Sequence, residues 1–89
     1  MIERDIEIIN KLGLHARAAA KLVNTAAHYA SATNINFGGH DADAKSIMSV
    51  MMLAASQGSM IRIRCEGKDE QEAMNALCDL INSYFDEDE

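Results

Sequence analysis

The sequence contains no proline, no tryptophan and no long apolar run, and it is poor in cysteine and aromatic residues. A membrane-spanning helix needs about 20 consecutive apolar residues, so no membrane insertion is expected. Cys65 and Cys78 are too far apart for a Cys-x-x-Cys metal pair, and we interpret both as buried thiols in a reducing cytosol. His15, His28 and His40 share no ligand spacing. The sequence therefore predicts no metal and no cofactor, and His28 and His40 are interpreted as surface residues.

Basic residues are also scarce, because 8 Lys and Arg stand against 14 Asp and Glu, a formal net charge of −6 at pH 7. This balance argues against a nucleic acid partner. Much of the acid lies at 69–72 and in the tail 86–89. The bases that lie near the candidate site or in the middle of the chain are Lys11, Arg17, Lys21 and Lys45. A local basic patch of this kind favours an acidic protein partner.

Eighty-nine residues predict one small domain, 1–89, with a core just large enough to fold alone. The first residues, 1–5, have no apolar run after a basic start, so they do not resemble a secretory signal and a cytoplasmic location is expected. The acidic tail 86–89 offers nothing to pack and is expected to fray.

Apolar periodicity predicts the order strand, helix, strand, strand, helix, strand, helix. The expected strands are 3–9, 32–37, 40–44 and 60–66, and the expected helices are 16–30, 47–55 and one that begins after Asp69. The stripe of small apolar residues on the first helix is expected to reach Ala30. Helices stacked on one side of an antiparallel sheet would bury all of these apolar faces, which predicts an α+β fold.

Several residues are predicted to end or begin these elements. Ser46 is a good N-cap for the second helix, and Gly58 is expected to close that helix in the left-handed conformation. Asp69 and Glu72 have the spacing of a capping box for the third helix. Tyr84 is placed at the end of the buried stripe of that helix.

The stretch from Asn10 to Val23 carries the candidate chemistry. It leaves a strand, turns at Gly13 and becomes a helix at His15, where an imidazole would face free backbone N–H groups and the positive end of the helix dipole. Such a site attracts phosphate, and Arg17 can add a charge-assisted contact. The helix end also favours a neutral, nucleophilic imidazole. Together these features indicate a histidine that accepts a phosphoryl group; the alternative is a simple N-cap with a solvated arginine.

The second helix is too apolar for its length. Ile47, Met48, Met51 and Met52 would point at least partly outward, and methionine-rich surfaces adapt to partners. The alternative is that some of these side chains fill the edge of the core.

Two motifs at this point resemble a known family. Gly13-Leu14-His15-Ala16-Arg17 resembles the phosphohistidine site of HPr, the histidine-containing phosphocarrier family of the bacterial phosphoenolpyruvate-dependent sugar phosphotransferase system. Lys45-Ser46-Ile47-Met48 resembles the regulatory serine site of the same family. The resemblance covers essentially the whole chain. It implies an open-faced β-sandwich of order βαββαβα, with a four-stranded antiparallel sheet and three helices on one face.

The resemblance also implies roles for individual residues. His15 would accept a phosphoryl group through Nδ1 from phosphorylated enzyme I and pass it to a histidine of a IIA protein. Arg17, with the N–H groups of Ala16 and Arg17, would hold the phosphoryl oxygens. Ser46 would be modified by an HPr kinase/phosphorylase in bacteria that have one. The partner-docking residues would be Ala20, Ile47, Met48, Met51 and Met52. Such a protein would be a monomeric intermediate in a phosphoryl relay, not a stand-alone enzyme.

One position departs from the family, which usually has proline directly after the arginine, where this chain has Ala18. Proline is tolerated but not required in a first helical turn, so we expect normal folding and a slightly more mobile site. Two further functions stay open. The acidic ending and the Met-rich helix also resemble the nitrogen-branch relative of HPr, and a non-phosphorylated HPr-like binding module is the remaining alternative.

Overall fold

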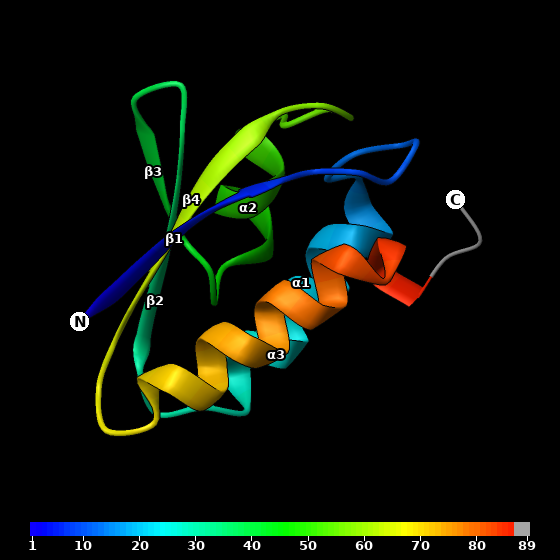
Figure 1. Cartoon of the computed structure of the whole chain (residues 1–89). Helices are drawn as coiled ribbons and strands as arrows, with labels where there is room; N and C mark the ends of the chain where they lie inside the picture. Colours follow the sequence, from blue (N-terminus) through cyan, green and yellow to red (C-terminus); the bar gives the residue numbers. More distant parts are fainter. Residues whose placement is uncertain (87–89) are drawn as a thin grey trace.

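A computed structural model of the chain describes residues 1–86 (Figure 1). The elements are β1 (Ile2–Glu7), α1 (Ala16–Ala27), β2 (Ala32–Phe37), β3 (His40–Asp43), α2 (Ile47–Met52), β4 (Met60–Glu66), α3 (Glu70–Asn82) and the short turn η1 (Tyr84–Asp86). Of the tail that was expected to fray, Asp86 is the last residue of η1, and 87–89 lie outside the described residues.

The four strands form one antiparallel sheet in the order β1-β4-β2-β3. The helices lie together on one face of this sheet (Figure 1), and α1 contacts both α2 and α3. The predicted open-faced α+β arrangement is therefore confirmed. β4 lies in the sheet interior because it pairs with both β1 and β2. Its Ile61, Ile63 and Cys65 point into the core, while the intervening residues point outward.

The core is formed between the sheet and the helices. Five residues of α1 are buried, and three of them are alanines, so this helix can approach its neighbours closely. The largest side chains that are fully buried include Ile8, Leu22, Ile35, Ile61, Ile63, Met74, Leu77, Ile81 and Phe85. Burying one such side chain contributes about 1.5–3 kcal/mol relative to its exposure.

The first strand and the first helix end earlier than their periodicity predicts. β1 ends at Glu7, although the next residue, Ile8, is fully buried. Ile8 donates its N–H to the carbonyl of Ser59 and accepts the N–H of Gly58, and both bonds lie outside the strand ladder. α1 ends at Ala27, and Ala30 is exposed, so its expected place on the buried stripe was wrong. The N–H of Ala30 is instead donated to Asp69 at 2.8 Å, which draws the chain out of the helix toward β2.

α2 is also shorter than predicted. It ends at Met52, and the left-handed residue that follows it is Ala54, with φ 54°, not Gly58. Gly58 lies in a separate turn before β4, where its N–H donates to Ile8. The chain leaves the helix early because Ala55 is buried and its carbonyl accepts the N–H of Leu14 at 2.9 Å. A tertiary contact therefore overrides the local helical periodicity.

The predicted capping box at α3 does not form. Asp69 is the N-cap residue, but its side chain makes no cap hydrogen bond. Its carboxylate accepts the hydroxyl and the N–H of Ser31 and the N–H of Ala30, which join the loop before β2 to the start of α3. These hydrogen bonds hold the pKa of the Asp69 carboxyl below its ordinary value, and the bond from the Ser31 hydroxyl contributes most.

Asp69→Asn is expected to destabilise the protein in a pH-dependent way. Because the folded-state pKa of Asp69 is lowered, its carboxylate stabilises the fold fully above the unfolded-state pKa, and this contribution is lost as pH falls through the folded-state pKa. The difference in unfolding free energy between wild type and variant should thus be greatest at neutral pH. In acid the two proteins should have similar unfolding free energies. Urea unfolding across pH would measure this difference. Asp79→Asn, an exposed site on α3, is the control, and an equal pH dependence in both variants would contradict the assignment.

The C-terminal end of α3 differs from the prediction by one residue. Tyr84 is 38% exposed, whereas Phe85 is fully buried. Tyr84, Phe85 and Asp86 all have φ near +60°, so the chain reverses its twist after α3 and turns Phe85 into the core. Lys21 Nζ of α1 donates to the carbonyl of Phe85 at 2.6 Å and fastens the turn to α1.

The remaining sequence predictions concern thiols and surface histidines. Cys65 and Cys78 are free and buried, as predicted, and burial raises the pKa of the Cys65 thiol. His28 and His40 are exposed. In the part of the chain that the structure describes, no helix is both long and apolar enough to cross a membrane.

Candidate functional site

The loop between β1 and α1 is fixed by backbone contacts with the segment after α2. Gly13 has φ +69°, and a Cβ at this position would lie 2.6 Å from the carbonyl oxygen of Ala55 and 2.8 Å from Cα of Ser56. Only glycine allows this approach together with the left-handed conformation. Leu14, which follows, is buried and donates its N–H to Ala55. The loop that leads into α1 is therefore pressed onto the residues that follow α2.

Asn10 closes the same loop from inside. It is fully buried, and its Nδ2 donates to the carbonyl of Gly13 at 2.9 Å while its own carbonyl accepts the Gly13 N–H at 3.2 Å. Its Oδ1 has no hydrogen-bond partner among the described residues. The sequence alone predicts no role for Asn10; the available signal is an asparagine at a strand end, three residues before a glycine.

His15 is the N-cap residue of α1. Its backbone is extended, with φ −76° and ψ 179°, and its carbonyl accepts the N–H of Ala19. Its Nδ1 accepts the N–H of Arg17 at 3.2 Å, and the side chain is half-buried. Because Nδ1 is an acceptor here, a neutral ring carries its proton on Nε2. The Nδ1 lone pair therefore points at the Arg17 N–H in the first turn of α1.

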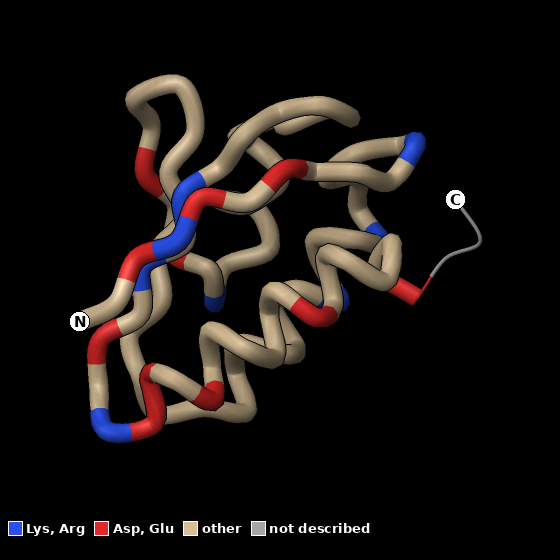
Figure 2. Tube along the Cα trace, viewed as in Figure 1, with Lys and Arg blue, Asp and Glu red and all other residues tan. Residues whose placement is uncertain are grey.

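The other residues of the first turn differ in exposure. Ala16 and Arg17 are exposed, and Ala18 is fully buried in the first turn of α1. Ala20 is half-buried. The bases of this region are Lys11 in the preceding loop and Arg17 and Lys21 in α1, whereas much of the acid lies along the sheet and on α3 (Figure 2). The site thus has a local positive charge on an acidic protein.

Ser46 begins α2 in the same way that His15 begins α1. Its hydroxyl accepts the N–H of Ser49 at 3.3 Å, which confirms the predicted N-cap. The residue is half-buried, and the turn before it is held by Asp43, whose carboxylate accepts the N–H of Lys45 at 2.9 Å. Ser46 is therefore accessible at a helix N-terminus.

The apolar residues of α2 divide between surface and core. Met52, Met48 and Ile47 are 79%, 67% and 40% exposed, and Met51 packs partly against the core. Leu12, in the loop before α1, is 69% exposed. α1 and α2 are in contact, so the exposed apolar residues of α2 lie on an element that neighbours α1, the helix of Ala20. All four of these side chains of α2 are therefore at least partly exposed, as predicted, and Met51 also packs against the edge of the core.

A family model described as the PTS HPr component phosphorylation site matches residues 2–83. The chain belongs to the HPr family. The phosphocarrier protein HPr of Cupriavidus necator is 54% identical to it over 89 residues, and the match covers all of both chains. A crystal structure of HPr from Thermoanaerobacter tengcongensis matches with a TM-score of 0.96 and 47% identity, again over the whole of both chains.

HPr is the phosphocarrier of the phosphotransferase system, and this HPr-family chain is similar to a second kind of phosphocarrier as well. The phosphocarrier protein NPr of Shewanella violacea is 40% identical over 86 residues, which is 97% of this chain and 94% of that protein. The identity to this NPr is lower than the identity to the HPr of Cupriavidus necator.

Proposed function

We propose that this protein carries a phosphoryl group on Nδ1 of His15 in the cytoplasm, as a monomer, receiving it from phosphorylated enzyme I and passing it to a histidine of a IIA protein. The observation that supports the proposal most is the Nδ1 atom itself. It accepts a hydrogen bond from the Arg17 N–H and so keeps its lone pair unprotonated in the neutral ring. A nucleophile at this nitrogen lies at a helix end that favours anions.

The transfer step needs no further reactant. The Nδ1 lone pair attacks the phosphorus of the donor's phosphohistidine, a new N–P bond forms, and the donor's N–P bond breaks and returns its electron pair to the donor imidazole. The same exchange in the opposite sense with a IIA histidine regenerates His15. In such transfers catalysis is mostly positioning and charge stabilisation, which an exposed helix end can supply without a deep pocket.

Phosphorylation would release the Arg17 amide for the phosphoryl group. Once Nδ1 is bonded to phosphorus, its lone pair no longer accepts the Arg17 N–H. A phosphoryl oxygen placed beside Nδ1 can then accept this N–H and that of Ala16, and the Arg17 guanidinium can add a charge-assisted bond. The Arg17 N–H that bonds His15 in the unphosphorylated protein is thus already positioned to bond the phosphoryl group after phosphorylation.

The docking face is proposed to comprise Ala20 and the four apolar residues of α2, Ile47, Met48, Met51 and Met52. Three of them are exposed at a helix that contacts α1, and flexible methionines can repack against different partners. The nearby bases favour the approach of acidic partner surfaces.

The test of the carrier function is phosphorylation by phosphoenolpyruvate and enzyme I, followed by intact mass and an acid-lability assay. Wild type should gain one acid-labile phosphoryl group and transfer it to a IIA protein, and His15→Ala should gain none. His28→Ala, which alters an exposed histidine at the other end of α1, should behave as wild type. A phosphorylated His15→Ala protein would contradict the assignment. If neither the sugar-branch nor the nitrogen-branch enzyme I phosphorylates wild type, the remaining function is a non-phosphorylated binding module. If transfer occurs, the enzyme I that transfers faster identifies the branch.

Ser46→Asp is expected to slow phosphoryl acceptance without unfolding the protein. Phosphorylation at Ser46 by an HPr kinase/phosphorylase would place about −2 charge at the N-terminus of α2, which the helix end tolerates but which would repel acidic partners. The aspartate should therefore lower the transfer rate from enzyme I at low salt, and the effect should shrink as salt screens the charge. Ser46→Asn, a good N-cap without charge, is the matched control. Equal rates for both variants at low salt would contradict an electrostatic mechanism.

A further inference from the structure

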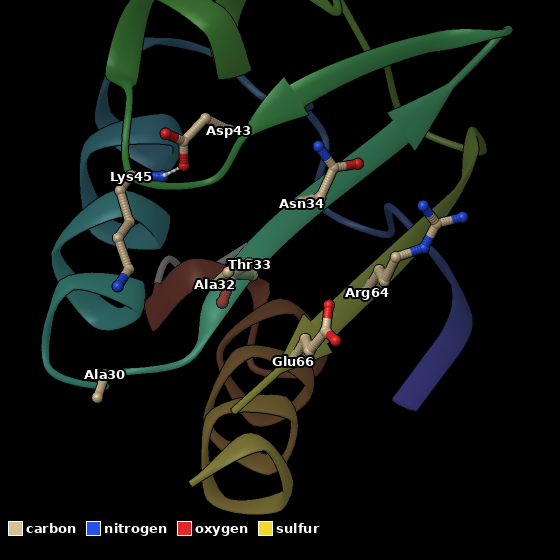
Figure 3. Close-up of a pocket in the computed structure, with 8 residues that line it drawn as sticks. All are labelled: Ala30, Ala32, Thr33, Asn34, Asp43, Lys45, Arg64 and Glu66. Carbon is tan, nitrogen blue, oxygen red and sulfur yellow. Dashed lines mark hydrogen bonds between the residues drawn. The ribbon is translucent and has the colours of Figure 1, made fainter. Parts of the chain in front are cut away.

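A cavity of about 480 Å³ lies on the outer side of the sheet, away from the helices (Figure 3). Its floor is Ala32, the first residue of β2, which is exposed and has only a small side chain. The cavity exists because β3 ends at Asp43, which pairs with Asn34, so β3 provides no partner in register for Ala32. A short strand and a small side chain together leave the hollow.

The two walls of the cavity each carry one positive and one negative side chain. Lys45 and Asp43 line one side, where the chain leaves β3, and Arg64 and Glu66 of β4 line the other, with Ala32 between them (Figure 3). The formal charge of these four side chains sums to zero at neutral pH. Asn34 adds a neutral amide to the lining.

Lys45 and Arg64 are held in place by hydrogen bonds and still have bonding capacity. Lys45 Nζ donates to the carbonyl of Tyr29 at 2.9 Å, and an ammonium has two further N–H groups. Arg64 Nε donates to Glu3 at 2.8 Å, which leaves the other guanidinium donors. In the described part of the chain, no hydrogen-bond partner is found for the Glu66 carboxylate. Lys45 and Arg64 therefore lose little freedom when a ligand binds, and the Glu66 carboxylate is available to accept from it.

We propose that this cavity binds a free amino acid as a zwitterion. An anion would be attracted by Lys45 and Arg64 but would bring like charge against Asp43 and Glu66, and a cation would meet the opposite problem. A ligand with both an ammonium and a carboxylate satisfies each wall without a net charge. The volume lies within the range of small-molecule sites, and it leaves room for a polar side chain near Asn34.

The site is separate from the phosphoryl site. Ala30, at its rim, follows the C-terminal end of α1, while His15 begins the helix. Twelve helical residues span about 18 Å, so a bound amino acid would not touch His15. The proposal therefore stands or falls independently of phosphoryl transfer.

The test is a titration of the ¹⁵N-labelled full chain with each of the common free amino acids, followed by NMR. We expect saturable shifts of the amides of Ala32, Asn34 and Lys45 for at least one amino acid, with a millimolar Kd because the cavity is open. Ala32→Leu, which fills the floor, should weaken binding at least about tenfold. Glu66→Gln, at an exposed position, should weaken it several-fold without affecting the fold. Ala27→Leu, an exposed change outside the cavity, should leave binding unchanged.

Three results would overturn the proposal. One is the absence of saturable shifts with every amino acid at tens of millimolar. The second is equal binding of inorganic phosphate or of glycerol at the same amides, which would show that a single charge or a neutral polyol suffices. The third is binding that is unchanged in both Ala32→Leu and Glu66→Gln.

Discussion

Gly13→Ala should destabilise the protein by about 2–5 kcal/mol and slow phosphoryl acceptance even though His15 is intact. The left-handed conformation costs a non-glycine residue about 1–2 kcal/mol, and overpacking adds about 1–3 kcal/mol. The clash is with backbone atoms of Ala55 and Ser56, so no side chain can rotate away and the loop itself must move. Because a displacement of about 1 Å can reduce a rate about a hundredfold, acceptance from enzyme I should fall at least tenfold.

Gly38→Ala separates the two causes. Gly38 is also left-handed, with φ +60°, but no atom lies within 4 Å of the position that its Cβ would take. This variant should therefore lose only the conformational part of the stability and transfer at the wild-type rate. Urea unfolding and the initial rate of phosphorylation, measured where both variants are folded, would make the comparison. Equal loss of stability in the two variants, with normal transfer by Gly13→Ala, would show that the contact with Ala55 does not position the site.

Phe85→Ala should cost about 3–5 kcal/mol, the typical loss for a buried phenylalanine. Phe85 is fully buried in the main core, and its carbonyl accepts Lys21 Nζ. For a domain whose total stability lies in the ordinary range of about 5–15 kcal/mol, this is a large fraction. Phe85→Leu should recover much of the loss because it refills most of the cavity.

Tyr84→Ala is the matched control for Phe85→Ala. Tyr84 is adjacent, aromatic and in the same left-handed turn, but it is 38% exposed. Its removal should cost clearly less than the removal of Phe85. Urea denaturation with the midpoint and slope of each transition would measure both. If Tyr84→Ala were the more destabilising change, the assignment of the core residue in this turn would be wrong.

The candidate site was only partly predictable from the sequence. The local order of Gly13, His15 and Arg17 predicts a turn, an N-cap and a nearby base because each property belongs to residues a few positions apart. The direction of Nδ1 toward the Arg17 N–H depends on the side-chain conformation, which the sequence does not specify. The buried role of Asn10 depends on the whole loop being packed against the segment after α2.

Two residues show the same limit at the ends of elements. Asp69 has the spacing of a capping box, but Ser31 and Ala30 approach it from the other side of the fold and take its carboxylate. Tyr84 continues the helical periodicity, but the left-handed turn that follows α3 places Phe85 in the core instead. In both cases the observed geometry includes a hydrogen bond from a residue about 40 or more positions away, Ser31 at Asp69 and Lys21 at Phe85, which the local pattern does not specify.

Apolar periodicity, including the stripe of small residues on α1, was enough to predict the order of elements, the antiparallel sheet and the helices on one face. These features depend on the period of each element and on the need to bury one face, and both are local properties of the sequence. Only the tertiary structure decided where α1 and α2 end, which carboxylate joins the loops, and that an open cavity lies beyond the end of β3. Those outcomes depend on contacts between distant segments, whose free energies exceed the weak local preferences of the residues involved.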